Sequence, residues 1–521
     1  MVHLGFSYIG VLWLIMLFVP NAFWAKNKPA DYDKYVNNEN KILLMLERTG
    51  EVLCSALCLI FSDFNIRRFT IWSLWLIASF VLMVLYELYW VRYFRSGKTM
   101  ADMYSSYAGF PVAGATLPCI AFLFLGIYGT NSFMIIAALI LSVGHIGIHL
   151  MHRKEVVPGK PVGRLKKVLR VIAAIPVVLI LLITFVAIAG RNINWFRNYI
   201  DTSKGVNEAV YLEIGGQEQY MLIRGRDTSN TVILYLHGGP GSPDACVSYL
   251  FTDYLIDDYT VVSWEQRGCG RTYFRNAASD PDNLTVDFDQ AINDTDQIVD
   301  MLRERFNTDK IIIVGHSYGS LLGSRYAQMH SDKVSAFVGI GQFVNLAESD
   351  EYAYEDALNV IEERGEDPTA LEAAYADYMK DSGNLQALVD FRSVHTPYHP
   401  ASVEANTIVA AFFSPYTGVD DLRWLLKQTD LDSYLKLNSE LMGVTASYDL
   451  RGEDEDYDIP MFFISGDRDF ICNYVLSEEY CDEITAPYKE YAVIPGCGHA
   501  PQFASPEEFA SVLKGMLDKA A

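Results

Sequence analysis

Cysteine is scarce and unpatterned in this 521-residue chain. Eight cysteines are scattered along it, with no CxxC pair and no cysteine–histidine zinc spacing. A disulfide framework is therefore excluded for a protein of this size. Cys472 and Cys481 could pair in an oxidising exterior, but we interpret them as small, partly buried residues. Internal repeats and low-complexity tracts are lacking as well.

Basic residues are few in the second part of the chain. Residues 1–200 hold 19 lysines and arginines against 9 acidic residues, whereas the remainder holds 22 against 55. Such an asymmetry indicates two different environments for the two parts. The acidic part would repel phosphates, which argues against nucleic acid as a partner.

Long apolar runs, by contrast, are plentiful before residue 191. A span of about 30 Å of hydrocarbon needs roughly 20 apolar residues. The sequence predicts six such spans, at Gly5–Ala25, Ile42–Phe61, Thr70–Tyr93, Phe110–Tyr128, Ser132–Met151 and Val171–Gly190. Glu47, Arg48 and Glu51 interrupt the second span, for which an interfacial or soluble amphipathic helix is the alternative.

Lysine and arginine gather in alternate loops of this region. The loops after the first, third and fifth spans are basic, whereas the loops between them hold only Arg67 and Arg68. Basic loops stay cytoplasmic. We therefore expect a multi-pass protein of the plasma membrane with the region after Arg191 on the extracytoplasmic side. A cleaved signal peptide is the alternative for the first span, but "MVHLG" lacks the positive charge of such peptides.

After Arg191, short apolar strands alternate with helices, which predicts a mostly parallel sheet covered on both faces. The expected strands are Ala209–Ile214, Tyr220–Arg224, Val232–Leu236, Thr260–Trp264, Ile311–Val314, Ala336–Ile340, Met461–Ile464 and Glu490–Ile494. The alternation stops between Gly341 and Ile459, where helices rich in acids and aromatics predict a cap over an active site. The expected organisation is therefore a membrane domain over 1–195, a core over 205–341 and 459–521, and a helical cap over 342–458.

A G-x-S-x-G motif follows the fifth expected strand, in "IIIVGHSYGS" at Ile311–Ser320. Its glycines permit a tight strand-to-helix turn that exposes the Ser317 hydroxyl above the sheet. The N–H of Tyr318, at the start of the next helix, is a candidate donor to an oxyanion. The motif predicts a serine nucleophile.

A serine nucleophile needs a base, and the base needs an orienting carboxylate. In this type of site the acid and then the histidine follow the serine along the chain. "FFISGDRDF" offers Asp467 and Asp469, and "YAVIPGCGHAPQF" offers His499. We predict Asp469 as the acid, because Asp467 falls inside the turn, and His499 as the base; a satisfied surface histidine is the alternative for His499.

A glycine-rich segment follows the third expected strand, in "HGGPG" at His237–Gly241. Glycines let backbone N–H groups approach a substrate without a Cβ in the way. In lipases and esterases that have a G-x-S-x-G turn, the loop after an early strand supplies the second N–H donor to the oxyanion. Gly238 or Gly239, together with Tyr318, is therefore the predicted oxyanion hole.

Five motifs together resemble the prolyl iminopeptidase family of α/β-hydrolases, over about Ala209–Ala521. They are "HGGPG", "WEQRGCGRT" at Trp264–Thr272, "GHSYGS", "GDRD" and "GCGHAP". The resemblance implies an α/β-hydrolase fold and the roles given above for Ser317, Asp469 and His499. The inserted helical cap and the N-terminal helical membrane domain follow from the patterns described above, so the expected chain is an α/β-hydrolase fused to a membrane domain. Glu265 stands where the family has aspartate, in a segment that we expect to pack the active-site loops.

The resemblance also implies that glutamates of the cap hold the free amine of the substrate. Glu348, Glu351 and Glu355 are the candidates, and solvated acids of an acidic helix are the alternative. The predicted function is thus a membrane-anchored serine hydrolase of the aminopeptidase type, acting on short peptides or amino-acid amides. Alternatives are an esterase or lipase acting on acyl groups from the bilayer, and a non-catalytic sensor or assembly module.

The expected partners are a small peptide or acyl substrate and the lipid bilayer, with no metal or organic cofactor; the oligomeric state is not predicted. Three histidines near the cytoplasmic end of the fifth span, His145, His149 and His152, recur at i, i+4 and i+7 and would share one helix face. A metal or proton site is conceivable there. We interpret them instead as polar interfacial residues that pack against neighbouring helices.

Overall fold

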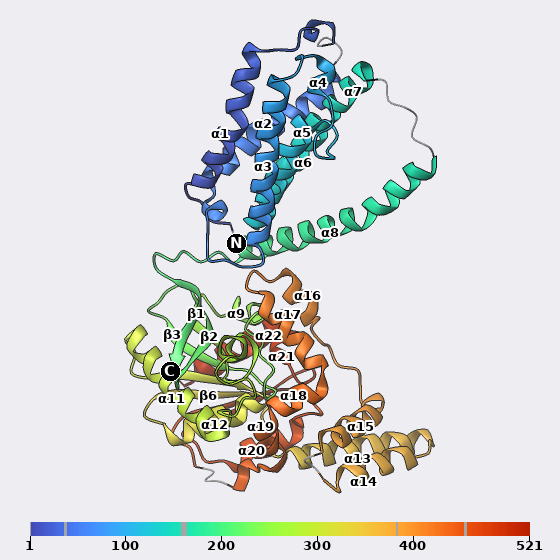
Figure 1. Cartoon of the computed structure of the whole chain (residues 1–521). Helices are drawn as coiled ribbons and strands as arrows, with labels where there is room; N and C mark the ends of the chain where they lie inside the picture. The colour runs from blue at the N-terminus through green and yellow to red at the C-terminus, as the bar shows by residue number, and fades with distance from the viewer. Residues whose placement is uncertain (1, 36–38, 158–163, 382–383, 453–455, 521) are drawn as a thin grey trace. The chain divides into compact units, whose positions relative to one another are not determined.

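The computed structural model describes residues 2–35, 39–157, 164–381, 384–452 and 456–520. The chain separates into two compact units, Met1–Arg197 and Asn198–Ala521. The first is helical and the second is built on a sheet (Figure 1). Each unit has its own hydrophobic core.

The helical unit is a bundle whose helices begin at polar caps. Asn40 accepts the backbone N–H groups of Ile42 and Leu43 at the start of α2, and Asn131 accepts that of Met134 at the start of α6. Such caps satisfy the free N–H groups of a helix terminus. The elements are α1 (Tyr8–Lys26), η1 (Tyr32–Lys34), α2 (Lys41–Ile60), η3 (Ser62–Phe64), α3 (Ser73–Phe94), α4 (Met100–Met103), α5 (Ala113–Tyr128), α6 (Ser132–Leu141), the π-helical η4 (Ser142–Ile146), α7 (Gly147–Val156) and α8 (Arg164–Arg197).

Within the described residues, four helices are long and apolar enough to cross a membrane: Tyr8–Lys26, Ser73–Phe94, Ser132–Val156 and Ala174–Arg197. All six predicted segments are helical, but α5 has only 16 residues and α2 carries three charged residues in its middle. The number of spans therefore stays a prediction. Apolar side chains such as Ile77, Val81 and Leu179 are exposed on the outside, as expected where lipid is the solvent.

The second unit contains one eight-stranded sheet with the order β1-β2-β4-β3-β5-β6-β7-β8. The pairings β1–β2 and β2–β4 are antiparallel, and the other five are parallel. Each expected strand lies within an observed one, and the predicted mostly parallel fold is confirmed. The strands are β1 (Val206–Ile214), β2 (Gln217–Gly225), β3 (Thr231–Leu236), β4 (Tyr259–Glu265), β5 (Ile311–His316), β6 (Val334–Ile340), β7 (Met461–Gly466) and β8 (Lys489–Ile494).

Helices bury both faces of this sheet. Along β3, Val232, Leu234 and Leu236 join one apolar core while Ile233 and Tyr235 join the other, because side chains alternate along a strand. On the first face lie α11 (Phe288–Phe306), α12 (Tyr318–Met329) and α20 (Tyr474–Glu483), and on the second lie α9 (Tyr249–Thr252), α21 (Pro501–Ala504) and α22 (Pro506–Leu517). Helix α10 (Gly270–Asn276) follows β4.

A helical insertion separates β6 from β7. It has a small core of its own, in which Tyr378 and Phe391 stack. Its elements are α13 (Leu346–Arg364), α14 (Thr369–Tyr378), α15 (Leu385–His395), η5 (Thr396–Tyr398), α16 (Thr407–Phe413), α17 (Val419–Thr429), α18 (Leu431–Leu437), α19 (Ser439–Ser447) and η6 (Leu450–Gly452). We refer to this insertion as the cap.

Candidate active site

Ser317 stands at the sharp turn between β5 and α12. Its backbone has φ 55° and ψ −124°, a conformation that residues other than glycine rarely adopt. The backbone N–H of Ser317 donates to the Ile340 carbonyl at 2.9 Å, which ties the turn to the end of β6. A strained residue held in this way is typical of functional sites. The side chain is 8% exposed at the carboxyl edge of the sheet.

His499 and Asp469 form a hydrogen-bonded pair in the loops after β8 and β7. Nδ1 of His499 lies 2.9 Å from Oδ2 and 3.0 Å from Oδ1 of Asp469. Asp469 is fully buried and also accepts the backbone N–H groups of Ile471 and Cys472. Asp467 is different, because it is partly exposed and accepts the backbone N–H of Gly496. Of the two acids considered from the sequence, Asp469 therefore contacts the histidine.

The pair lies next to the serine turn. Nε2 of His316, the residue before Ser317, donates to the His499 carbonyl at 2.9 Å, and the two rings have centroids 4.8 Å apart. The Cys472 thiol, in the loop of Asp469, lies beside the Ser317 hydroxyl, and burial raises the pKa of this thiol. Cys472 and Cys481 are both free and buried. Three loops that are far apart in the sequence thus meet at one edge of the sheet.

Two buried histidines of this region are neutral at pH 7. Burial lowers the pKa of His237 to about 4 and that of His316 to about 3. Neither ring therefore brings a positive charge next to His499.

The His237–Gly241 loop packs directly onto the serine turn. A Cβ built on Gly238 would lie 2.9 Å from the Ser317 Cβ and 3.0 Å from the His316 carbonyl oxygen, so only glycine permits this approach. Within the described residues, no hydrogen bond engages the backbone N–H of Gly238, Gly239 or Tyr318. Backbone N–H groups that are not engaged in other hydrogen bonds can stabilise an oxyanion.

The loop is held from both sides. From the core, Gln266 donates its backbone N–H to His237 Nε2 at 3.2 Å and its side-chain amide to the His237 carbonyl at 2.9 Å. From the cap, Trp424 Nε1 donates to the Gly241 carbonyl at 3.0 Å, and the Tyr434 hydroxyl donates to the Pro240 carbonyl at 2.6 Å. The contacts of Trp424 and Tyr434 were not predicted. Helical periodicity indicates which face of a helix is buried, but it does not indicate which segment packs against that face.

The rest of the "EQRG" segment is also buried and bonded. Glu265 accepts the backbone N–H of Arg271 at 2.6 Å, and burial raises the pKa of its carboxyl to about 8. Arg267 Nε donates to Asp294 of α11 at 2.7 Å, in a pair that is almost fully buried. These bonds fix the segment that carries Gln266.

The three candidate glutamates of the cap all lie on helix α13. Glu348 forms an ion pair with Arg451, and Glu351 and Glu355 are exposed on α13. A different acid of α13, Asp350, is fully buried, where its carboxylate accepts from Tyr378 at 3.0 Å and from Arg392 at 3.0 and 3.1 Å. Its position could have been found from the sequence, because Ala353, Ala357 and Ile361 continue the same buried stripe of α13.

Comparisons with known proteins agree with this architecture. A family model described as "alpha/beta hydrolase fold" matches residues 231–506. A probable aminopeptidase of Bacillus subtilis strain 168 is 27% identical over 318 residues, covering 60% of this chain and 97% of that protein. A proline iminopeptidase of Arabidopsis thaliana is 32% identical over 129 residues, which is 25% of this chain and 31% of that protein.

Among solved structures, a membrane phospholipase A described as a bacterial virulence factor aligns with a TM-score of 0.44 and 20% identity, covering 68% of this chain and 98% of that one. The family match extends over more than half of the present chain, from the start of β3 to the start of α22. This chain therefore belongs to the α/β-hydrolase family, and its sheet-containing unit is similar in sequence to a probable aminopeptidase and to proline iminopeptidases.

Proposed function

We propose that this chain is a membrane-anchored serine hydrolase, an aminopeptidase of the proline iminopeptidase type that acts through an acyl-enzyme. The observation that carries the proposal is the His499–Asp469 pair beside the serine turn, with the glycine loop packed against Ser317. We further propose that the hydrolase unit is extracytoplasmic, because basic residues gather in the loops expected to be cytoplasmic.

In the proposed mechanism, the Ser317 oxygen attacks the substrate carbonyl while Nε2 of His499 takes the hydroxyl proton. Asp469 accepts from Nδ1 of His499, which orients the ring and stabilises its protonated form. The N–H of Tyr318 and that of Gly238 or Gly239 receive the oxyanion. His499 then gives its proton to the leaving amine, and the acyl-enzyme remains. Water, deprotonated by His499, releases the acid and restores Ser317.

The placement of the cap acids bears on how a substrate amine would be held. Glu348 already binds the Arg451 guanidinium, so a substrate ammonium would have to compete with Arg451. Recognition of the amine by Glu348, Glu351 or Glu355 stays a prediction. The strongly acidic charge of the unit favours a cationic substrate in any case, because its field attracts cations.

An esterase or lipase is the second candidate, and one feature of the cap favours it. Helix α17 buries Trp424 against the glycine loop, and α16 and α17 expose a set of apolar side chains: Ile408, Val409, Phe412, Val419, Leu422, Leu425 and Leu426. An exposed apolar surface of this kind marks a site for a membrane or another apolar partner. Acyl groups from a bilayer could enter beneath such a cap.

Two assays on the purified full chain distinguish these functions. We expect labelling by a fluorophosphonate probe, and faster hydrolysis of proline β-naphthylamide than of p-nitrophenyl butyrate when the two kcat/KM values are compared. Faster hydrolysis of the ester would favour the esterase. A chain that neither reacts with the probe nor hydrolyses either substrate would favour the non-catalytic module.

A methyl group at Gly238 should impair turnover. In Gly238→Ala the new Cβ must move the loop away from Ser317 and His316, and with it a predicted oxyanion donor. We expect kcat to fall about 10²-fold with little change in KM, because the donor acts mainly in the transition state. Gly443→Ala, in the cap helix α19, is the matched control because its Cβ meets nothing within 4 Å. An unchanged kcat in Gly238→Ala would show that this loop supplies no oxyanion donor.

A further inference from the structure

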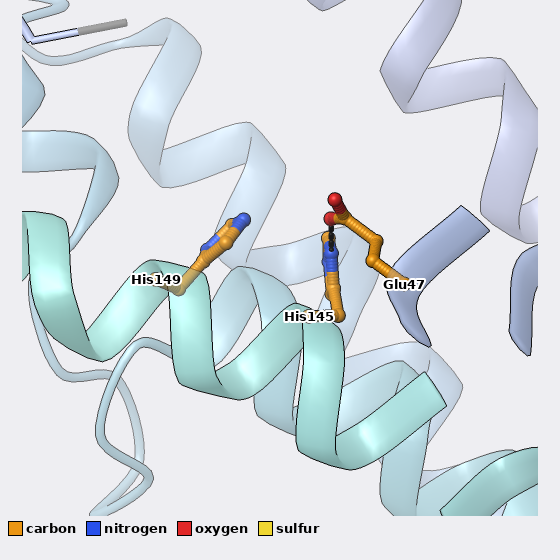
Figure 2. Close-up of side chains that lie close together, drawn as sticks. All are labelled: Glu47, His145 and His149. Atoms are coloured by element: carbon orange, nitrogen blue, oxygen red, sulfur yellow. Dashed lines mark hydrogen bonds and ion pairs between the residues drawn. The ribbon is translucent and has the colours of Figure 1, made fainter. Parts of the chain in front are cut away.

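The helical unit contains a cluster of side chains that the hydrolytic chemistry does not use. Glu47 comes from α2, His145 from η4 and His149 from α7, and Figure 2 shows all three pointing toward one another. A carboxylate oxygen of Glu47 and one ring nitrogen of each histidine all lie within 4.8 Å of one another. Nδ1 of His145 is hydrogen-bonded to the Glu47 carboxylate.

Close backbone packing brings these residues together. A Cβ on Gly144 would lie 2.2 Å from the Glu47 backbone nitrogen, and a Cβ on Gly50 would lie 2.5 Å from Leu141 Cα. The two glycines therefore let α2 lie directly against the α6–η4 helix. This contact sets the Glu47 carboxylate beside the His145 ring.

The helix is irregular at this place. Ser142–Ile146 form a π-helical turn that ends just after His145, between two α-helical segments. Such single turns are rare and occur frequently at functional sites. His145 and His149 are four residues apart and share one face, with ring centroids 4.4 Å apart. The irregular turn and the first turn of α7 thus place two imidazoles side by side.

The cluster borders a cavity of about 840 Å³ inside the unit. Tyr104 also lines it, with its ring edge-on to His149 and stacked on His152. His152 is 4% exposed, and its Nε2 lies 3.7 Å from Glu39 Oε1. Ionisable groups inside a membrane-type helical unit are costly and mark functional sites.

We propose that Glu47, His145 and His149 bind one divalent transition-metal ion of the Zn²⁺ class. Two imidazoles and a carboxylate suit Zn²⁺, Fe²⁺, Ni²⁺ or Cu²⁺, whereas Mg²⁺ and Ca²⁺ prefer oxygen ligands alone. Three protein ligands leave a coordination position for water or a substrate, as in catalytic rather than structural zinc sites. All three proposed ligands line the cavity, so a small ligand could reach the ion.

The test is metal binding by the full chain in detergent, purified with a tag that contains no histidine. After treatment with a chelator, the wild-type chain should take up one Zn²⁺ per chain by mass spectrometry of the metal. Co²⁺ should give the visible absorption of a four-coordinate ion. Zinc content below about a tenth of an ion per chain, with no cobalt spectrum, would overturn the proposal.

Substitutions of the three proposed ligands test whether the ion binds at this cluster. Glu47→Gln, His145→Gln and His149→Gln should each weaken Zn²⁺ binding by at least about tenfold. Glu51→Gln is the matched control, because Glu51 lies on the same helix and lines the same cavity but forms an ion pair with Arg48. Size-exclusion profiles and thermal unfolding show whether each variant is folded. Ligand variants that bind like the wild type would also reject the site. None of these measurements depends on Ser317.

Discussion

Replacing Ser317 by alanine will lower the kcat/KM for proline β-naphthylamide by about 10⁶-fold and abolish fluorophosphonate labelling. The alanine has no oxygen to attack the carbonyl, and loss of the nucleophile of a triad costs nearly as much as loss of all three members. Binding and any oxyanion donors are retained, so a residual rate above that of water is expected. Labelling and kinetics on the purified full chain measure the effect.

The matched control for this substitution is Ser324→Ala. Ser324 is also a buried serine of α12, and its hydroxyl donates to the Leu321 carbonyl within the same helix. Its replacement should leave kcat/KM within about twofold of the wild type, since a typical lost hydrogen bond affects stability by only about 1 kcal/mol. If Ser317→Ala is labelled as strongly as the wild type, Ser317 is not the nucleophile.

Replacing Asp469 by asparagine should lower kcat by about 10⁴-fold while KM changes little. Asp469 accepts from Nδ1 of His499, which leaves Nε2 free of a proton and able to act as a base. An asparagine can present its amide N–H to Nδ1 instead and thereby stabilise the opposite tautomer. Steady-state kinetics give the change in kcat, and thermal unfolding shows whether the variant is folded.

Asp467→Asn tests the assignment between the two acids. Asp467 lies two residues earlier in the same turn, is partly exposed, and accepts the Gly496 N–H. An asparagine oxygen can accept the same bond, so kcat should stay within about tenfold of the wild type. A larger loss in Asp467→Asn than in Asp469→Asn would move the orienting role to Asp467.

Local sequence signals predicted the strands well. The expected strand at Val232–Leu236 differs from the observed β3 by a single residue, because a run that is apolar at every position indicates burial on both faces. The order of the strands could not be read in the same way. It places β4 between β2 and β3, and such pairings depend on contacts between residues that are distant in the sequence.

The side chains around the site were harder to predict than its motifs. Glycines and a serine at fixed spacing indicated the turn of Ser317, whereas the contacts of Trp424 and Tyr434 join residues almost two hundred positions apart. The contact of Glu47 could not be predicted from the sequence either. From the sequence Glu47 was a reason to doubt the second span, but the structure pairs it with His145, on a helix 98 positions away.

The glycine loop has a further consequence for how the enzyme would select substrates. Because Trp424 and Tyr434 donate hydrogen bonds to Gly241 and Pro240, a shift of the cap would either carry the loop with it or break these two bonds. Part of the energy from contacts between a substrate and the cap is then available to align the loop during the reaction. A shortened substrate that leaves the cap unfilled would lose turnover rather than affinity, which is the behaviour expected when remote binding energy is used for catalysis.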